Sequence, residues 1–227
     1  MSGAAGPRGR DEELLLARVS AAAGRAHLGR RHATYRAPPT GPGARWAAAG
    51  RLLRAGAVTG AGARLDVYEH GMTAATGRRI HVIRFDVTVV RRRRVLSSRG
   101  ITRALVLLDV DGGRIVLRRG DFGRPEEWWP EIRRAVTDAQ VPRALAALSQ
   151  GARLVFGPVW ITRDEVGTGG TTLRWAQVRR IEVLNGLVTV RAAGRRQALT
   201  TVASGIPNLC VFRALAEHLA GAERDDD

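Results

Sequence analysis

The sequence predicts an α+β fold of two small antiparallel β-rich modules, each closed by a C-terminal helix, with a helical arm in front. The last two-thirds of the sequence contain an internal repeat, because Gly62-Ala63-Arg64-Leu65 recurs as Gly151-Ala152-Arg153-Leu154. Each copy continues through short alternating strands and ends in a proline followed by a helical segment, from Pro125 and from Pro207. Repetition on the scale of a domain is examined first, because overlooking it misassigns the whole fold. The shared order of strands, proline and helix predicts two copies of one module.

Composition and the positions of glycine and proline divide the chain into four parts. The parts are 1–61, an N-terminal helix and a Gly/Pro-rich linker; 62–150, the first module; 151–221, the second module; and 222–227, an acidic tail. Residues 1–10 have the composition of a disordered segment. Asp11 is a suitable N-cap for a helix to Arg25, with an apolar face at helical spacing. Within the linker, 45–54 reads as plain linker or as two turns of basic helix.

The first module is expected to contain short strands, one clear hairpin and a closing helix. Strands are predicted at 65–67, 80–82 and from Thr88 to Leu96, with a turn at His70-Gly71. Two further strands, 101–110 and 114–117, form a hairpin around Asp111-Gly112-Gly113, whose residues tolerate the positive φ of a tight turn. Pro125 is expected at the first position of the helix, with two glutamates in the first turn. Its apolar stripe is Trp129, Ile132, Val136 and Ala139, and Pro142 is expected to break or restart the helix.

The second module repeats this plan in shorter form. Its strands are predicted at 153–156, 159–162, 173–175, 178–184, 187–192 and 197–202. Asn185-Gly186 between two apolar pairs is the strongest two-residue hairpin signal in the chain. The closing helix is predicted over about 208–220.

Arginine dominates the charge of this chain. All 37 basic residues are arginine, and the formal net charge is +16. Mechanisms that need a lysine are therefore excluded, among them the P-loop and Schiff-base chemistries. Residues 1–62 and 63–150 each carry a net charge of +7, whereas 151–227 carry only +2. An anionic partner is therefore expected to meet the first 150 residues.

Arg91, Arg92, Arg93 and Arg94 form the sharpest electrostatic feature. In a strand these side chains alternate between both faces, and their mutual repulsion predicts that the segment projects beyond the packed sheet. One interpretation is an anion-binding site, since each guanidinium offers a bidentate fork for phosphate. The other is that the charges prevent strand pairing between molecules.

Patterns for enzymatic or metal chemistry are weak throughout the sequence. Cys210 is single and lies in an apolar run, so a disulfide framework is excluded and a buried thiol is expected. Asp109-Val110-Asp111-Gly112 begins like a calcium loop but has Arg114 where that loop requires glycine, and reads as a turn. His27 and His32 lie beside arginines, whose charge opposes a metal ion, while His70 and His81 read as isolated. No catalytic residues, metal or cofactor are predicted.

Four tryptophans have two possible roles. Given the charge, they could stack on nucleic-acid bases. Their positions instead favour the large apolar core residues that small modules need. These tryptophans are Trp128, Trp129, Trp160 and Trp175.

Several short antiparallel strands closed by one amphipathic helix resemble the pleckstrin-homology-like barrel, in which the helix plugs one end of a bent sheet. Three groups of segments also resemble an actinobacterial family of proteins with a domain of unknown function. They are Tyr68-Glu69-His70-Gly71; Phe122 to Trp128 with Ala135 to Gln140; and Phe156 to Thr162 with Ile206-Pro207-Asn208. The similarity covers about 62–220, with Leu28-Gly29 added. The resemblance implies the fold alone, because no catalytic residue is assigned in that family.

These observations predict a non-enzymatic binding or adaptor protein that recognises a protein or peptide partner. Exposed strand edges and the groove beside a closing helix are natural docking sites for extended segments. The alternative is peripheral binding to anionic lipids of the inner membrane through Arg91–Arg94. A third possibility, nonspecific nucleic-acid binding, is disfavoured by the nearly neutral second module and the absence of a nucleic-acid motif. No small-molecule substrate is expected, and the chain reads as cytoplasmic, with attachment to the inner face of the membrane as an option.

Overall fold

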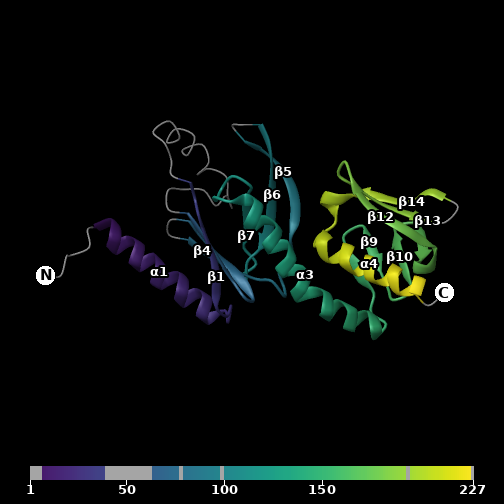
Figure 1. Ribbon diagram of the computed structural model, residues 1–227, viewed down its shortest axis with the longest axis horizontal. Coiled ribbons are helices and arrows are strands. Elements are labelled where there is room, and N and C mark those ends of the chain that lie inside the picture. Colours follow the sequence, from purple (N-terminus) through teal and green to yellow (C-terminus); the bar gives the residue numbers. More distant parts are fainter. Residues whose placement is uncertain (1–6, 39–62, 77–78, 98–99, 193–194, 226–227) are drawn as a thin grey trace. The chain divides into compact units, whose positions relative to one another are not determined.

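A computed structural model describes residues 7–38, 63–76, 79–97, 100–192 and 195–225. In this part of the chain the fold is α+β, with three α-helices and four antiparallel sheets (Figure 1). Each described sheet is open, so the expectation of closed barrels is corrected to open sheets. The possible helix at 45–54 lies outside the described residues.

Helix α1 (Pro7–Arg25) begins earlier than the sequence predicts, so the expectation of disorder is wrong for residues 7–10. Val19 and Ala22 are buried as predicted, while Leu15 and Ala26 are partly buried. The C-terminal end of α1 packs on the first sheet, where Ala23, Leu28 and Tyr68 form a small apolar cluster. The helix therefore buries its predicted face.

The first sheet has the order β1-β2-β3-β4. Its strands are β1 (Arg31–Arg36), β2 (Arg64–Tyr68), β3 (Gly71–Thr76) and β4 (Arg79–Arg84). The predicted strands at 65–67 and 80–82 are confirmed, but β1 and β3 were not predicted. In β1 the polar residues mask the alternation, and its partner β2 lies beyond the linker, with Tyr35 opposite Leu65. Every residue of β2 is buried.

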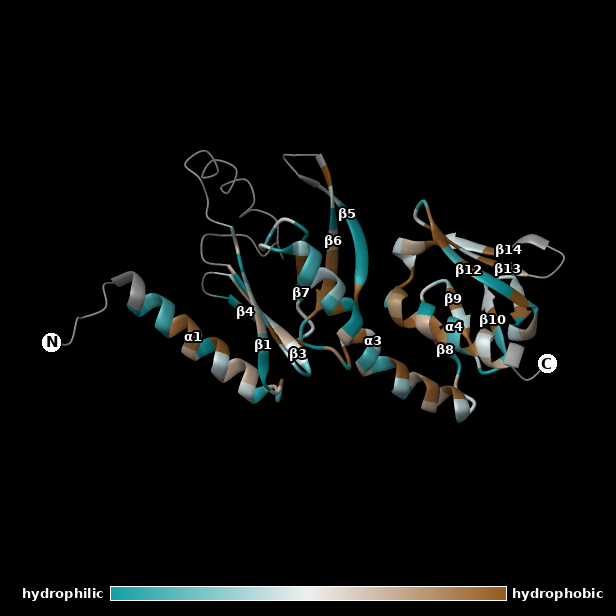
Figure 2. Cartoon of the chain, viewed as in Figure 1, coloured by the Kyte–Doolittle hydropathy of each residue, from teal (hydrophilic) through white to brown (hydrophobic). Residues whose placement is uncertain are grey.

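The second sheet has the order β5-β6-β7, with β5 (Arg91–Ser97), β6 (Gly100–Leu108) and β7 (Arg114–Arg118). The predicted hairpin is confirmed: Gly112 has φ +78°, and Asp109 accepts hydrogen bonds from the backbone of Asp111 and Gly113. The arginine segment does not project beyond the sheet, because Arg91 to Ser97 pair with Val106 to Gly100 along the whole strand. Figure 2 shows the hydrophilic β5 beside the hydrophobic β6.

Helix α3 (Pro125–Ser149) begins at the predicted proline, with Glu126 and Glu127 in its first turn. It continues through both Pro130 and Pro142, so the predicted break at Pro142 is wrong. The apolar stripe is also shifted by one residue at its start. Trp128 is fully buried and contacts Phe122 edge-on at 5.9 Å, whereas Trp129 is only partly buried.

Two further sheets follow, with orders β11-β10-β9-β8 and β12-β13-β14. Their strands are β8 (Leu154–Phe156), β9 (Val159–Ile161), β10 (Glu165–Thr168), β11 (Thr171–Arg174), β12 (Val178–Leu184), β13 (Leu187–Ala192) and β14 (Arg195–Val202). All six predicted strands are present, and β10 is an additional strand that the sequence does not predict. The hairpin turn at Asn185-Gly186 is confirmed, with φ of +50° and +81°.

Helix α4 (Leu209–Asp225) closes the chain and begins within one residue of its predicted start. Leu209, Phe212, Leu215 and Ala216 are buried. The helix continues to Asp225, so most of the predicted acidic tail is helical. Cys210 is partly buried rather than fully enclosed.

The element order passes twice through a four-stranded sheet, a three-stranded sheet and a helix. By their contacts, the residues form two units, Met1–Thr88 with Leu108–Trp129 and Val89–Leu107 with Pro130–Asp227. The boundary at residue 150 stays a prediction. None of the described helices is long and apolar enough to cross a membrane.

Candidate functional site

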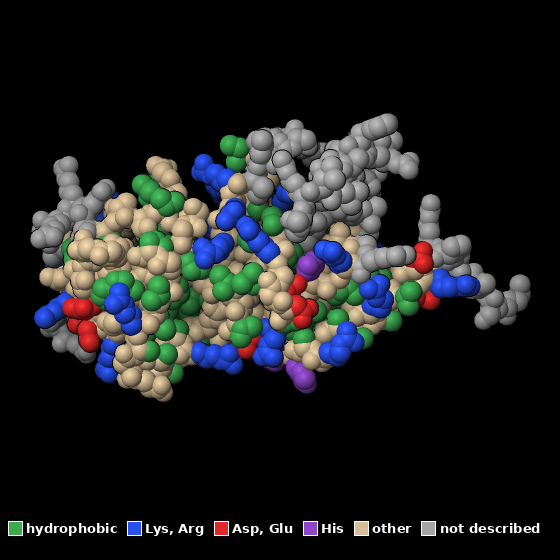
Figure 3. All heavy atoms as spheres, turned by 180° about the vertical axis from the view of Figure 1, so that it is seen from behind, with side chains coloured by type: hydrophobic (Ala, Val, Ile, Leu, Met, Phe, Trp, Pro, Cys, Tyr) green, Lys and Arg blue, Asp and Glu red, His purple; other side chains and the backbone are tan. Residues whose placement is uncertain are grey.

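The structure separates the four arginines of the predicted anion site. In the β5–β6 ladder Arg92 lies opposite Leu105, and Arg94 lies opposite Arg103. The side chains of Arg92 and Arg94 therefore lie on the same face of the strand pair as those of Leu105 and Arg103. Arg91 and Arg93 lie on the other face. Arg91 and Arg92 are partly buried and Arg93 and Arg94 are exposed. Basic side chains are more prominent than acidic ones on the face of the molecule that Figure 3 shows.

β5 is the outermost strand of its sheet. This position is compatible with the interpretation of the arginines as a guard against strand pairing between molecules. Burial and the nearby Arg133 lower the pKa of Arg92 from its ordinary value. Arg92 is therefore a charge held partly out of water, unlike the exposed Arg93 and Arg94.

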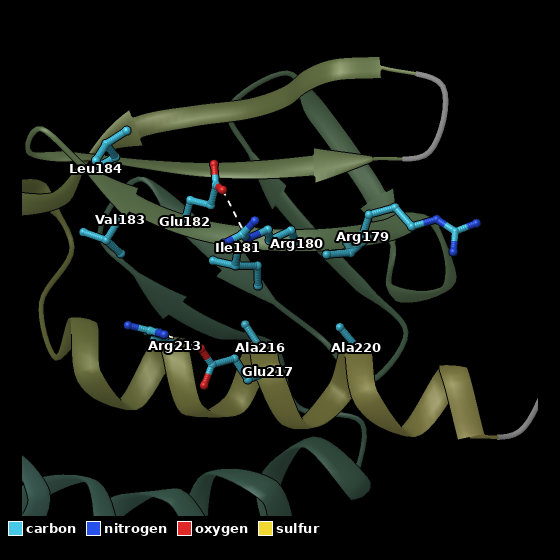
Figure 4. Close-up of a pocket in the computed structure, with 11 residues that line it drawn as sticks. Arg179, Arg180, Ile181, Glu182, Val183, Leu184, Arg213, Ala216, Glu217 and Ala220 are labelled. Atoms are coloured by element: carbon cyan, nitrogen blue, oxygen red, sulfur yellow. Dashed lines mark hydrogen bonds and ion pairs between the residues drawn. The ribbon is translucent and has the colours of Figure 1, made fainter.

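A groove of the second unit lies between β12 and α4 (Figure 4). Its volume is about 500 Å³. Ile181 and Val183 of β12 point toward the helix, and Ala216 and Ala220 of α4 face them. The alanine side chains are short and leave space above the helix. Ile181 and Val183 are only partly buried. These four residues give the groove an apolar part, but its lining is more polar than apolar, and Ala216 and Ala220 are themselves buried.

Ion pairs lie along the rims of this groove. On α4, the Arg213 Nε donates to the Glu217 carboxylate at 2.6 Å. On β12, Glu182 accepts from the Arg191 Nε at 2.9 Å and lies 3.1 Å from the Arg180 Nε. Because these carboxylates are already paired, the rims are polar without a strong excess of either charge.

β12 is also the outermost strand of its sheet. In an antiparallel ladder, every second residue of such a strand turns its backbone N–H and C=O away from its partner. Unpaired groups of this kind are a template for another strand. An outer strand edge and a partly apolar groove therefore lie beside each other at β12.

The first unit contains a comparable groove between α1 and β4, of about 630 Å³. Ala22 and Ala26 of the helix and Ile80 and Val82 of the strand line it. Here the strand edge is partly occupied, because the Val110 N–H donates to the Val82 carbonyl at 2.8 Å. This groove is thus less open to strand addition than the one beside β12.

Two of the residues considered for metal chemistry, His81 and Asp109, contact each other. His81 is not isolated, since its Nδ1 lies 2.8 Å from the Asp109 carboxylate that holds the β6–β7 turn. Asp109-Val110-Asp111-Gly112 is a turn, as predicted. The described residues contain no group of three or more histidine, cysteine or acidic side chains that could hold a metal ion.

The tryptophans divide between the core and the surface. Trp128 and Trp175 are buried to 0% and 1% exposure, which confirms the core interpretation for these two. Trp160 is partly buried beneath the Arg153 guanidinium, 3.9 Å from the ring centroid, so its face is already covered.

Sequence reasoning predicted a docking groove beside a closing helix but not its residues. The only local signal was the pair of alanines one turn apart in α4, because small residues leave room above a helix. Which strand lies opposite them depends on tertiary packing, and the sequence does not give it.

The fold and groove define a class: a mixed α+β chain with open antiparallel sheets and a groove beside its last helix. Residues 52–225 match a family of unknown function, DUF6585, and the chain belongs to this family. No curated protein matches the chain. No solved structure matches it either.

Proposed function

We propose that this chain is a non-enzymatic, cytoplasmic binding protein that recognises an extended segment of a partner protein at the open edge of β12. The observation that carries the proposal is the groove between β12 and α4, with partly buried Ile181 and Val183 facing Ala216 and Ala220. An extended peptide gains main-chain hydrogen bonds from a strand edge and specificity from pockets for alternate side chains. The outer position of β12 and the groove beside it support this recognition mode.

The same proposal assigns both copies to the pleckstrin-homology-like class and places the chain in an actinobacterial branch of its family. Support comes from the element order, in which four strands, three strands and a helix follow one another twice. In this interpretation α3 and α4 are the closing helices of a tandem repeat, and β12 is the equivalent of β5. The first copy then carries the arginine run Arg91–Arg94 in the strand whose equivalent in the second copy, β12, is less charged.

The groove favours a segment with apolar side chains at alternate positions. Side chains of a strand alternate between its two faces, so every second residue of an added strand would point toward α4. Ile181 and Val183 offer apolar contact there, while Arg180 and Glu182 lie on the other face. The intervening residues of the segment would face solvent and the paired charges of the sheet.

The test is selection of random peptides on the immobilised full-length chain, followed by fluorescence anisotropy with the enriched peptides. Val183→Lys places a charge in the groove, and we expect it to weaken binding at least about tenfold. The matched control is Val202→Lys. Val202 is 54% exposed on β14, the opposite edge strand of the same sheet, and its replacement should leave the affinity unchanged.

A second variant keeps the test decisive if Val183→Lys unfolds the protein. Glu217→Trp fills the groove from an exposed position of α4, and His218→Trp is its control on the next residue, outside the groove. Peptides that bind the two groove variants as well as the wild type would contradict the proposal. So would a library from which no peptide is enriched.

Peripheral binding to anionic lipids is the alternative. Exposed Arg93 and Arg94 favour it, but the two lie on opposite faces of β5 and present a narrower basic surface than four aligned side chains. Co-sedimentation with anionic and neutral vesicles checks it, and loss of anionic pelleting in an Arg93→Ser, Arg94→Ser variant would support it. Nonspecific nucleic-acid binding ranks below both, because the two fully buried tryptophans offer no stacking surface.

A further inference from the structure

Three elements of the second unit meet at Asn208, just before α4. The Val90 N–H donates to the Asn208 side-chain oxygen at 2.6 Å, and the Asn208 N–H donates to the Val90 carbonyl at 2.8 Å. The Asn208 Nδ2 donates to Gln140 of α3 at 2.8 Å. The start of β5, the middle of α3 and the start of α4 are therefore held together by direct hydrogen bonds.

Arginines from these elements gather beside this junction. Arg92 follows Val90 by two residues and lies on the same face of the strand pair as Leu105, which is fully buried. The charged groups that act on Arg92 are the guanidinium groups of Arg133 on α3, Arg103 on β6 and Arg213 on α4, with the Cys210 thiol. Arg92 and Arg133 are partly buried, whereas Arg103 is exposed on the same face of the strand pair as Arg92.

These guanidinium groups are poorly neutralised. The Nε of Arg133 is buried and has no hydrogen-bond partner among the described residues. Neither Arg92 nor Arg103 makes an ion pair with a carboxylate of the described chain, while Arg213 is held by Glu217 at 2.6 Å. Burying a charge without a partner is costly, and like charges beside it add to the cost. An anion in this place would remove both penalties.

We propose that Arg92, Arg103 and Arg133 form a binding site for a phosphate group. A guanidinium presents a planar fork of N–H donors that matches phosphate oxygens in bidentate geometry, and several forks match a dianion. Partial burial of Arg92 and Arg133 strengthens their contacts with an anion relative to those of an exposed arginine such as Arg103. The phosphate belongs either to a small soluble ester or to a lipid headgroup, which present the same chemistry to these residues. This site is separate from the β12 groove and does not depend on it.

The first experiment measures thermal unfolding of the full-length chain in sodium phosphate against sodium chloride of equal ionic strength. A ligand that binds only the folded state raises the unfolding temperature in proportion to its occupancy. We expect phosphate to stabilise the wild type, and Arg92→Gln and Arg133→Gln each to lower its affinity for phosphate about tenfold or more. In chloride alone, the two variants should be at least as stable as the wild type, because a repulsive charge has been removed.

Two neighbouring arginines serve as matched controls. Arg93 is exposed on the opposite face of β5, and Arg134 is exposed on α3 next to Arg133. Arg93→Gln and Arg134→Gln remove the same charge and should keep the phosphate effect of the wild type. Absence of any phosphate effect in the wild type would overturn the proposal. Equal losses in the control variants would also overturn it, because they would show a general charge effect.

A second arm identifies the source of the phosphate. The protein is sedimented with vesicles of phosphatidylglycerol and phosphatidylcholine, and with phosphatidylcholine alone, in the presence and absence of inorganic phosphate. Binding of the anionic vesicles that depends on Arg92 and Arg133 and is displaced by phosphate would assign the site to a lipid headgroup. Stabilisation by free phosphate without vesicle binding would assign it to a soluble ester.

Discussion

Asp66 places a negative charge in the interior of the first sheet, with none of its side chain exposed. Its carboxylate accepts hydrogen bonds from the Arg64 guanidinium at 2.6 and 2.8 Å and from the Thr34 hydroxyl at 2.6 Å. The partners come from β1 and β2, which the linker separates in sequence. These three hydrogen bonds satisfy the buried carboxylate. Removing the carboxylate would leave the Arg64 guanidinium buried without an ion-pair partner.

Asp66→Ala should therefore lower the free energy of unfolding by about 3–5 kcal/mol. The comparison is Glu217→Ala, which breaks an exposed ion pair whose partners are 54% and 53% exposed and should change stability by less than about 1 kcal/mol. Urea titration of both variants measures the difference. Equal losses would show that the buried pair contributes no more than a surface one.

Tyr68 lies beside this pair, and burial raises the pKa of its hydroxyl above the ordinary value, with Asp66 adding to the effect. The unfolded chain then ionises at a lower pH than the folded chain. Stability from this group is complete below about pH 10 and falls as the pH rises through the folded-state pKa. Urea midpoints in alkaline buffers should fall more steeply for the wild type than for Tyr68→Phe. Identical slopes would contradict this assignment.

At the scale of elements, the segments that carry the family resemblance meet one another in the structure. The His70 N–H donates to the Leu28 carbonyl at 2.9 Å, and the Arg30 N–H donates to Glu69 at 3.0 Å. Tyr68 contacts the same Leu28 in the apolar cluster. These motifs therefore join α1 and β1 to the β2–β3 turn, which is a structural role.

Asn208 is the corresponding junction in the second unit, and Asn185 provides a matched comparison. Both asparagines have left-handed backbones, with φ of +47° and +50°, but Asn185 lies in an exposed turn. Replacing either with alanine carries the cost of that backbone conformation. Asn208→Ala also breaks the hydrogen bonds to Val90 and Gln140, so it should cost about 1–3 kcal/mol more than Asn185→Ala. Thermal unfolding of the two variants checks this, and equal shifts would contradict it.

Local chemistry predicted the hairpin turns and the helix faces of this chain. Asp111-Gly112-Gly113 and Asn185-Gly186 are turns because their residues accept positive φ, a property that does not depend on distant contacts. The prediction failed where the partner is distant. β1 pairs across the linker, and α3 continues through Pro142 in spite of its local preference for a break.

At the scale of the whole molecule, the described contacts form two units rather than two halves of the sequence. β5 and most of β6 belong with the second unit, together with Asn208 and α4. The sequence could not show this, since the first and second modules are contiguous in the chain.

Hydrogen exchange measured by mass spectrometry should reveal these units as separate opening reactions. Asp66→Ala is expected to accelerate exchange in β2 and β3 and to leave β12 and β13 unchanged. Asn208→Ala should accelerate exchange at the start of β5 and leave β2 unchanged. Uniform acceleration throughout the chain in either variant would mean that it unfolds as one cooperative body.

The sequence by itself determined the α+β class, the two hairpin turns, the approximate positions of the helices and the exclusion of lysine chemistry, because each depends on residue identity or near-neighbour spacing. Tertiary structure alone decided that Arg92 lies near Arg133 while Arg93 faces away, and that Ile181 faces Ala216 across an open groove. It also decided that Trp128 rather than Trp129 enters the core. Such features arise from contacts between elements far apart in the chain, and their energies depend on burial, which no short window of sequence contains.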